Sequence, residues 1–227
     1  MSEETNIVIA IDGPAGAGKS TVCKLLAKRF NLKYLDTGAM YRALALKALE
    51  NGLGPDDGDE AAKLGESSSI SFGDGDPQAV LLDGRDVTSQ IRFPEIGELA
   101  SALSAHTPVR KVLVAQQKRL VAAGGVVLEG RDVTTVVAPE AEVKIFLTAG
   151  LDERANRRYK ELIGRGLAAE LDEVRKQIAL RDERDSSRAD SPLIVAPGVI
   201  VIDTDGLSID QVVNRIAELA TAVTTSS

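Results

Sequence analysis

The amino-acid sequence predicts an α/β fold, with a central, mainly parallel five-stranded sheet flanked by helices. Five short runs are apolar almost throughout and rich in β-branched residues, which is typical of parallel strands buried on both faces. Segments with helical spacing of apolar residues separate these runs, and strands that alternate with helices favour a parallel sheet. The predicted strands are residues 6–11, 33–36, 126–129, 143–147 and 199–202.

Helices are predicted between and after these strands. In residues 19–30, apolar side chains recur at helical spacing at Val22, Leu25 and Leu26. Cys23 lies beside this apolar face and is therefore expected in the core. The other predicted helices are residues 40–50, 108–124, 151–164, 170–185 and 208–223.

The region from Asn51 to Phe93 interrupts the alternation of strands and helices. Its first part, LGPDDGDE (53–60), has the composition of a polar loop, and two short β-like runs follow at 69–72 and 79–84. Because a structureless loop of about 40 residues is uncommon, an inserted antiparallel β subdomain is predicted here rather than one long loop.

Composition and charge narrow the possible classes of protein. The 227 residues carry a formal net charge of −7, which disfavours a general binder of nucleic acid or of anionic membranes. No run approaches the roughly 18 apolar residues that a membrane span needs. His106 is the only histidine, which excludes His-based metal clusters and nucleophile systems, and the single Cys23 fits a reducing cytosol.

Residues 13–20, GPAGAGKS, satisfy the pattern G-x-x-x-x-G-K-[ST] between a predicted strand and a predicted helix. Glycines let the backbone N–H groups turn inward on phosphate oxygens, and the start of the helix adds its positive dipole end. Lys19 can reach the β- and γ-phosphates of a nucleotide, and Ser20 can ligate Mg²⁺. The predicted nucleotide-binding residues are Gly13, Pro14, Ala15, Gly16, Ala17, Gly18, Lys19, Ser20 and Thr21.

A phosphate-binding loop alone leaves three classes open: a small-molecule kinase, a GTPase-like switch and a motor ATPase. The sequence has no N-K-x-D segment, with which a GTPase reads guanine. The acidic balance of the chain disfavours a DNA motor.

Two further motifs follow predicted strands, at the edge of the sheet where ligands bind in such folds. In DTGAMYR (36–42), Thr37, Tyr41 and Arg42 can surround one anion, although Tyr41 would also fit a half-buried core position. In GRD (130–132), Arg131 can fork onto a phosphate and Asp132 can accept from an amino group; the alternative is a structural Arg–Asp pair.

Glu129 ends the strand just before the GRD motif. An acidic residue at this point can hold Mg²⁺ through a water molecule.

Arginines recur at helical spacing in the last third of the chain. Arg181, Arg184, Asp185 and Arg188 share one helix face, which suits several phosphates but also a solvated face.

Arg154, Arg157 and Arg158 share another face, ahead of the break at 164–166. This second segment predicts a mobile lid that carries arginines over a transferred phosphoryl group, with a plain helical hairpin as the alternative.

Taken together, these motifs resemble those of the bacterial cytidylate kinases, which are nucleoside-monophosphate kinases with a P-loop kinase fold. The motifs that carry the resemblance are IDGPAGAGKST (11–21), LDTGAMYR (35–42), EGRDVTTVV (129–137), PEAEVKIFL (139–147) and RDERDSSR (181–188). They extend over most of the chain, in matching order and spacing.

The resemblance implies transfer of phosphate from ATP, with Mg²⁺, to CMP or dCMP in pyrimidine nucleotide metabolism. The residues that it implies for catalysis are Lys19, Arg131, Arg157, Arg158 and Arg181. Those implied for binding the acceptor's phosphate and ribose are Thr37, Tyr41, Arg42, Arg131, Arg181 and Asp185. Those implied for reading cytosine are Ser101, Arg110, Asp132 and Arg188.

The expected organisation is a single P-loop kinase domain in a cytoplasmic monomer that binds neither nucleic acid nor membranes. Its parts are a core (about 5–36, 105–150 and 186–223), a monophosphate-binding region with the β insert (about 37–104) and a helical lid (about 151–185). Two rival functions stay open: a kinase of the same fold for another metabolite, such as shikimate or dephospho-coenzyme A, and a non-catalytic nucleotide switch.

Overall fold

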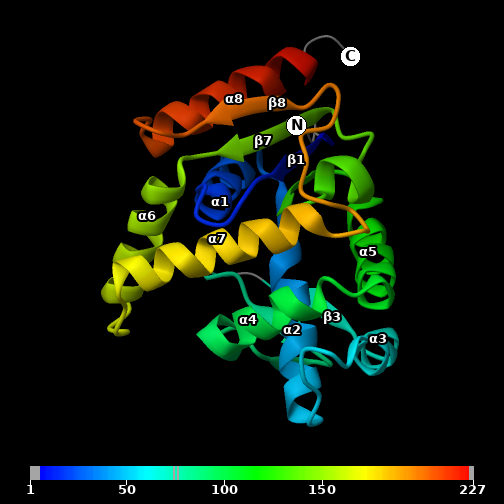
Figure 1. The fold of residues 1–227 in the computed structure, drawn as a ribbon. Coiled ribbons are helices and arrows are strands. Elements are labelled where there is room, and N and C mark those ends of the chain that lie inside the picture. The colour runs from blue at the N-terminus through cyan, green and yellow to red at the C-terminus, as the bar shows by residue number, and fades with distance from the viewer. Residues whose placement is uncertain (1–5, 74, 76, 225–227) are drawn as a thin grey trace. The chain divides into compact units, whose positions relative to one another are not determined.

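The computed structural model describes residues 6–73, 75 and 77–224. The chain divides into two compact units (Figure 1). The core unit consists of residues 1–34 and 123–227, and the insert unit consists of residues 35–122. Within the described ranges, no helix combines the length and the hydropathy that a membrane crossing requires.

The main sheet has five strands in the order β2-β6-β1-β7-β8. Strand β1 pairs in parallel with β6 and β7, and β7 pairs in parallel with β8. The predicted α/β architecture with a parallel sheet is confirmed, and each strand lies within two residues of its predicted ends. The strands are β1 (Val8–Asp12), β2 (Lys33–Asp36), β6 (Val126–Gly130), β7 (Val143–Thr148) and β8 (Ile200–Asp203).

Helices α1 (Lys19–Phe30) and α8 (Ile209–Thr224) cover one face of this sheet (Figure 1). Alternate residues of β1, including Ile9 and Ile11, point into the apolar cluster that the two helices complete. Cys23 is fully buried there, as predicted. Burial of a continuous apolar layer between sheet and helices is the main stabilising contribution in such a fold.

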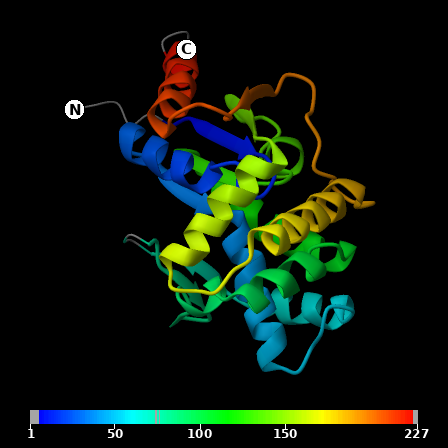
Figure 2. The same ribbon diagram turned by 60° about the vertical axis from the view of Figure 1, so that its left-hand side comes forward.

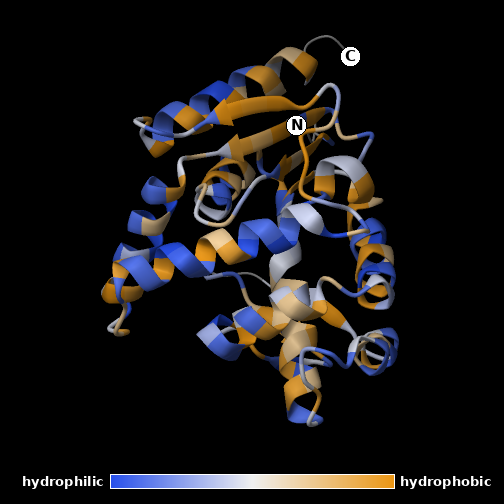
Figure 3. Ribbon diagram, viewed as in Figure 1, coloured by the Kyte–Doolittle hydropathy of each residue, from blue (hydrophilic) through white to orange (hydrophobic). Residues whose placement is uncertain are grey.

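Helices α6 (Leu151–Gly164) and α7 (Leu171–Ser187) form a hairpin in the core unit (Figure 2). Their contact is a small apolar cluster of Ala155, Val174 and Ile178, while most of the surface of both helices is hydrophilic (Figure 3). With so little apolar area joining the two helices, charged side chains decide much of how they are held.

A five-residue π-helical turn, η2 (Val133–Val137), follows β6 and was not predicted from the sequence. Its run of valine and threonine carries no helical period that a pattern search detects. Single π-turns are frequent at functional sites, and this one follows the GRD motif directly.

The insert unit contains the predicted antiparallel sheet, which has three strands in the order β3-β4-β5. Helix α2 begins at Thr37, three residues earlier than predicted, because Asp36 caps it by accepting from the Ala39 N–H at 3.0 Å. The elements are α2 (Thr37–Glu50), α3 (Gly58–Glu66), β3 (Ile70–Phe72), β4 (Val80–Leu82), β5 (Arg85–Asp86), η1 (Gln90–Arg92), α4 (Pro94–Leu103) and α5 (Thr107–Val121).

Two helices of the insert unit depart from the sequence expectation. The polar stretch 53–60, expected to be a loop, includes the first three residues of α3, whose buried Ala61 and Ala62 pack against neighbouring helices. Helix α4 was not predicted either; it starts with Pro94 at its first position. Both helices are short, so tertiary packing rather than a long apolar period stabilises them.

Gly58 provides a test of the packing of α3. A Cβ atom added at Gly58 would lie 2.3 Å from Cγ of His106, whose Nε2–H donates to the Pro55 carbonyl at 2.8 Å. We expect Gly58→Ala to lower the free energy of unfolding by about 2 kcal/mol, measured by urea denaturation, because the imidazole must move. In a His106→Ala background the same change should be nearly neutral; an equal loss in both backgrounds would contradict this packing.

Candidate active site

The loop between β1 and α1 has the geometry of a phosphate-binding loop. Gly13 lies so close to β7 that a Cβ atom there would come within 2.0 Å of the Leu147 carbonyl oxygen. Gly18 caps α1 with a left-handed φ of 91°, which glycine adopts without strain. The first turn of α1 carries no acidic residue, so the positive end of the helix dipole is not offset there.

Lys19 is buried at the start of α1 and turns back onto the loop. Its Nζ donates to the carbonyl oxygens of Gly13 at 2.8 Å and Pro14 at 2.9 Å. Burial, and then the nearby charge of Arg131, lower the pKa of Lys19 to about 7. A negative group such as a phosphate would favour its charged form, so the side chain is suited to anion binding.

Arg154, at the start of α6, links the loop to α7. Its Nε donates to the Ala149 carbonyl at 2.9 Å, and its Nη1 reaches the Ala15 carbonyl at 3.3 Å and Asp182 at 2.6 Å. The side chain is 8% exposed, so this ion pair is poorly screened. The sequence analysis placed Arg154 on the face of the predicted lid but did not single out Asp182, because a charged helix face gives no indication of which charges are buried together.

The two other arginines of α6 have different surroundings. Arg157 donates to Oγ1 of Thr204 at 2.9 Å and to its carbonyl at 3.1 Å, and it also pairs with Glu153. The Thr204 hydroxyl in turn lies 3.1 Å from the Thr148 carbonyl and 3.5 Å from the Ala17 carbonyl of the phosphate loop, to either of which it can donate. Arg158 pairs with Glu161 at 2.7 Å. Arg157 is therefore one residue removed from the phosphate loop, and Arg158 is held along its own helix.

Asp185 of α7 is buried among three arginines that come from different points of the chain. Arg131 donates to it at 2.8 Å, and nitrogens of Arg188 and Arg181 lie 3.7 and 4.0 Å from its oxygens. Burial opposes its ionisation, but the three positive charges prevail and hold the pKa of Asp185 below its usual value. Guanidinium groups bind phosphate oxygens through strong, paired hydrogen bonds, so a cluster of three arginines is suited to bind an anion.

The GRD motif therefore does not rest on a local Arg–Asp pair alone, since Arg131 reaches a carboxylate 54 residues further along the chain. The sequence prediction that Arg181, Asp185 and Arg188 share one face is consistent with this geometry, although α7 ends at Ser187. Only tertiary structure brings Arg131 to them.

The donors for a divalent cation are few. Ser20 is exposed at the first turn of α1, and Glu129 is a buried carboxylate that accepts a hydrogen bond from the Tyr34 hydroxyl. Among the described residues, no group of three or more His, Cys, Asp or Glu side chains could hold a metal ion by itself. One hydroxyl and one carboxylate fit Mg²⁺, which keeps several waters and binds through substrate phosphates.

Asp12 is a buried acidic residue that the sequence analysis did not consider. It ends β1, is fully buried, and accepts three hydrogen bonds from Val133 and Thr134 of η2. Burial raises its pKa, although each hydrogen bond acts in the opposite direction. The only feature of the sequence that could have pointed to Asp12 is that it is a charged residue at the end of an otherwise apolar strand.

The predicted site residues of the insert unit lie on α2, α4 and α5. Arg42 donates to the Ile91 carbonyl at 3.2 Å, and its guanidinium lies against Gly97, where a Cβ atom would be 2.8 Å away. Tyr41 points elsewhere: the guanidinium of Arg110 lies 5.8 Å from the centre of its ring, within the range of a cation–π contact.

Two serines complete this group. Arg110 also donates to the Ser104 carbonyl at 3.3 Å, and the Ser104 hydroxyl donates to the carbonyl of Ser101. Thr37 is buried at the start of α2. The insert unit thus brings Tyr41, Ser101 and Arg110 into one neighbourhood.

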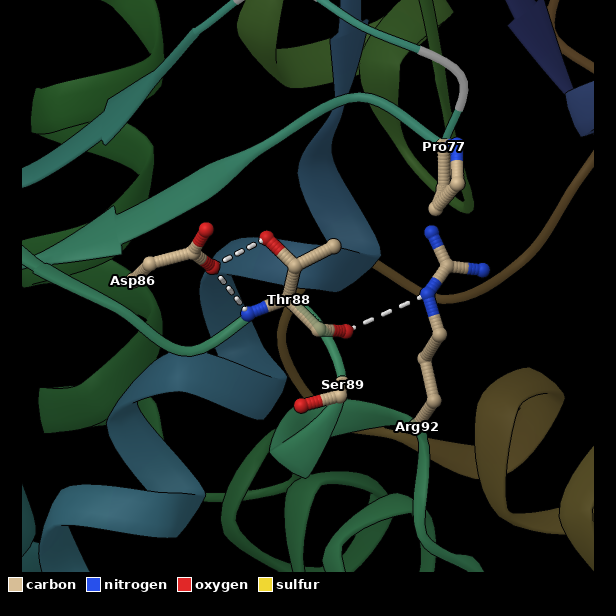
Figure 4. A pocket seen from close by; sticks show the side chains of 5 residues that line it. All are labelled: Pro77, Asp86, Thr88, Ser89 and Arg92. Atoms are coloured by element: carbon tan, nitrogen blue, oxygen red, sulfur yellow. Dashed lines mark hydrogen bonds between the residues drawn. The ribbon is translucent and has the colours of Figure 1, made fainter.

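A cavity of about 370 Å³ lies in the insert unit beside β5 and η1 (Figure 4). It is lined by Pro77, Asp86, Thr88, Ser89 and Arg92. Asp86 accepts from the N–H and hydroxyl of Thr88, and Arg92 donates to the Thr88 carbonyl, so these groups stabilise the turn itself. None of the predicted site residues lines this cavity.

Comparison with known proteins identifies the family. The model of the cytidylate kinase family matches residues 9–222. A cytidylate kinase of Carboxydothermus hydrogenoformans is 50% identical over 212 residues, 93% of this chain and 96% of the relative. One of Exiguobacterium sibiricum is 49% identical over 215 residues, 94% of this chain and 96% of the relative.

Among solved structures, an uncharacterized protein of Eubacterium ventriosum superposes with a TM-score of 0.52 at 14% identity, covering 96% of this chain and 99% of that one. At this identity the likeness concerns the fold alone.

The lowered pKa of Lys19 predicts a pH-dependent contribution to stability. Between pH 7 and the ordinary lysine value of 10.5, the unfolded chain holds a proton on this side chain that the folded chain largely lacks. The free energy of unfolding of the unmutated chain should therefore rise with pH above pH 7, relative to Lys19→Met, by roughly 1 kcal/mol per pH unit.

The measurement is urea denaturation from pH 7 to 9, without nucleotide. Lys28→Met changes an exposed position of the same helix and is the control. Its free energy of unfolding should change with pH in parallel with that of the unmutated chain. If the free energy of unfolding of Lys19→Met also changed with pH in parallel with that of the unmutated chain, Lys19 would have an ordinary pKa.

Proposed function

Because the chain belongs to the cytidylate kinase family, we propose that it transfers the γ-phosphoryl group of ATP to CMP and dCMP, giving ADP and CDP or dCDP. The observation that supports this reaction best is the coexistence, within the core unit, of two sites for anions. One is the glycine loop with buried Lys19, and the other is the arginine cluster around Asp185. A kinase whose acceptor is itself a phosphate needs one anion site for the phosphates of ATP and another for the phosphate of the acceptor.

In the proposed donor site, residues 13–21 bind the phosphates of ATP. Loop N–H groups and the start of α1 supply partial positive charge, and Lys19 leaves its carbonyl partners for phosphate oxygens. Ser20, and Glu129 through a water molecule, would hold Mg²⁺ between them and the phosphates. When bound, this ion neutralises the charge that develops on the transferred group.

In the proposed acceptor site, Arg131, Arg181 and Asp185 bind the phosphate and ribose of CMP. Thr37, Tyr41 and Arg42 of the insert unit contribute further donors to the same nucleotide. The acceptor oxygen belongs to a phosphate whose second pKa is near 6, so it is largely deprotonated at neutral pH. No general base is needed, which is compatible with a chain that has a single histidine.

We propose that the cytosine base is read by Asp132 and Arg188 of the core unit and by Ser101 and Arg110 of the insert unit. The carboxylate of Asp132 would accept from the exocyclic amino group of cytosine. Uracil presents a carbonyl oxygen at that position, which a carboxylate repels.

Arg157 and Arg158 are proposed to act on the transferred phosphoryl group when α6 and α7 cover it. Arg157 would exchange Thr204 for a phosphate oxygen, and Arg158 would exchange Glu161. Exclusion of water at that stage prevents wasteful hydrolysis of ATP. We further propose that the enzyme acts as a monomer in the cytoplasm.

The reaction is tested by ADP release from Mg-ATP in a coupled assay, with CMP, dCMP, UMP, AMP, GMP, dTMP and shikimate offered separately. We expect strong turnover with CMP and dCMP and weak turnover with UMP. Lys19→Ala should abolish it, because an anion-binding charge is lost, while Lys28→Ala should leave it unchanged.

Other outcomes identify the rivals. Turnover with a different acceptor would retain the donor site and discard the proposed cytosine readers. ATP binding without turnover on any acceptor would indicate a nucleotide switch.

Base recognition is tested by comparing CMP with UMP in Asp132→Ala. The variant should lose more kcat/KM with CMP than with UMP, by about 1–3 kcal/mol, the value of one buried hydrogen bond to a charged group. Glu140→Ala, an exposed acidic residue after the same turn, serves as the control. An equal loss with both nucleotides would mean that Asp132 does not read the base.

A further inference from the structure

Asp12 occupies a junction between two parts of the proposed site. It is the last residue of β1 and lies in register with Gly130, the last residue of β6. The phosphate loop begins one residue later, at Gly13, and Arg131 and Asp132 follow directly after Gly130. A group at Asp12 can therefore affect the loop that carries the two proposed acceptor residues.

The carboxylate of Asp12 makes three hydrogen bonds, all to the turn that follows Asp132. Oδ1 accepts from the Val133 N–H at 2.9 Å, and Oδ2 accepts from the Thr134 N–H at 2.8 Å and the Thr134 hydroxyl at 2.6 Å. The residue is 0% exposed, and Thr134 is 2% exposed. Both oxygens are thus engaged, in a buried place where such bonds are strong.

These bonds replace the capping that an aspartate ordinarily performs for its own helix. Asp132 is the N-cap residue of η2, but its side chain makes no cap hydrogen bond; the first N–H groups of the turn bind Asp12 instead. The carbonyl of Asp132 accepts from Val136 at 2.8 Å, which closes the turn. The backbone around Asp132 is thereby fixed in two ways: its carbonyl is held by N–H groups of its own turn, and the next two residues are held by Asp12 of the neighbouring strand.

A buried carboxylate is an expensive way to secure a short turn. Burial raises the pKa of Asp12, which indicates that the ionised form is disfavoured by its surroundings. An apolar residue would stabilise the end of β1 at lower cost, as buried ionic groups generally show. The cost is understandable if the exact placement of the turn matters for function.

We propose that Asp12 is a positioning residue for the acceptor nucleotide: through Val133 and Thr134 it sets the position of Arg131 and Asp132. This inference rests on the proposed function, in which Arg131 binds the acceptor's phosphate and Asp132 reads its base. Asp12 itself touches neither substrate.

The test uses the full chain and three conservative variants. Thr134→Val removes one of the three bonds, and Thr134→Ser retains the hydroxyl. Asp12→Asn replaces one acceptor oxygen by an NH2 group, so one of the two backbone N–H groups loses its acceptor. Thr135→Val is the matched control, because the Thr135 hydroxyl lies in the same turn but donates to the Asp132 carbonyl at 3.2 Å rather than to Asp12.

We expect Thr134→Val to raise the KM for CMP about threefold to tenfold, as the loss of one buried hydrogen bond implies, and Asp12→Asn to raise it further. The preference for CMP over UMP should fall in both variants, while the KM for ATP changes less than about twofold. Thr134→Ser and Thr135→Val should retain the KM and the preference of the unmutated enzyme.

Amide hydrogen exchange at Val133 and Thr134, measured without nucleotide, provides a readout that does not depend on activity. Faster exchange in Thr134→Val together with a higher KM for CMP supports the proposal. Faster exchange with unchanged KM and unchanged base preference overturns it, since Asp12 would then be structural only. If the unmutated chain does not phosphorylate CMP, the proposed function is refuted instead. That outcome is distinguished from the first two because exchange at Val133 and Thr134 is measured independently of activity.

Discussion

The in-register parallel pairing of β1 with β6 determines where the chemistry of the core unit lies. Asp12 and Gly130 end their strands opposite each other, so the phosphate loop and the loop carrying Arg131 begin at the same edge of the sheet. On the other side of β1, the backbone of β7 comes so close to Gly13 that no side chain fits between them. Backbone geometry, before any catalytic side chain is considered, brings two loops together there.

Positively charged side chains then make this edge of the core unit suitable for binding phosphate. The chain as a whole is acidic, with a net charge of −7, yet Arg131, Arg181 and Arg188 gather around the carboxylate of Asp185. Burial and a nearby guanidinium lower the pKa of Lys19 to about 7. Without substrate, the repulsion among the arginines and the burial of Lys19 both destabilise the protein. Both effects are reduced when a phosphate supplies negative charge.

Side chains within each unit are held by contacts of that unit. In the insert unit, Arg42 is oriented by the Ile91 carbonyl, and Arg110 by the Tyr41 ring and the Ser104 carbonyl. In the core unit, Arg154 is oriented by backbone carbonyls and by Asp182. Guanidinium groups fixed in this way lose less conformational entropy when they bind an anion, which is the physical basis of a preorganised site.

Local patterns in the sequence were sufficient for the elements whose residues interact with near neighbours along the chain. The five strands, helix α1 and the glycine loop were predicted closely, because apolar period and loop chemistry are local properties. Helices α3 and α4 and the π-turn η2 were not predicted, because packing against distant segments stabilises them more than their own sequence does.

The same division applies to the candidate site. Local sequence patterns were enough to predict the parallel α/β fold, the phosphate loop and most of the charged residues that could bind a nucleotide. Three contacts became known from the folded chain: Arg131 pairs with Asp185, Arg154 is buried against the loop with Asp182, and Asp12 caps the turn after Asp132. The sequence separations within these three pairs are large, and a buried ionic contact leaves no periodic signal, so its partners become apparent only when the chain is folded.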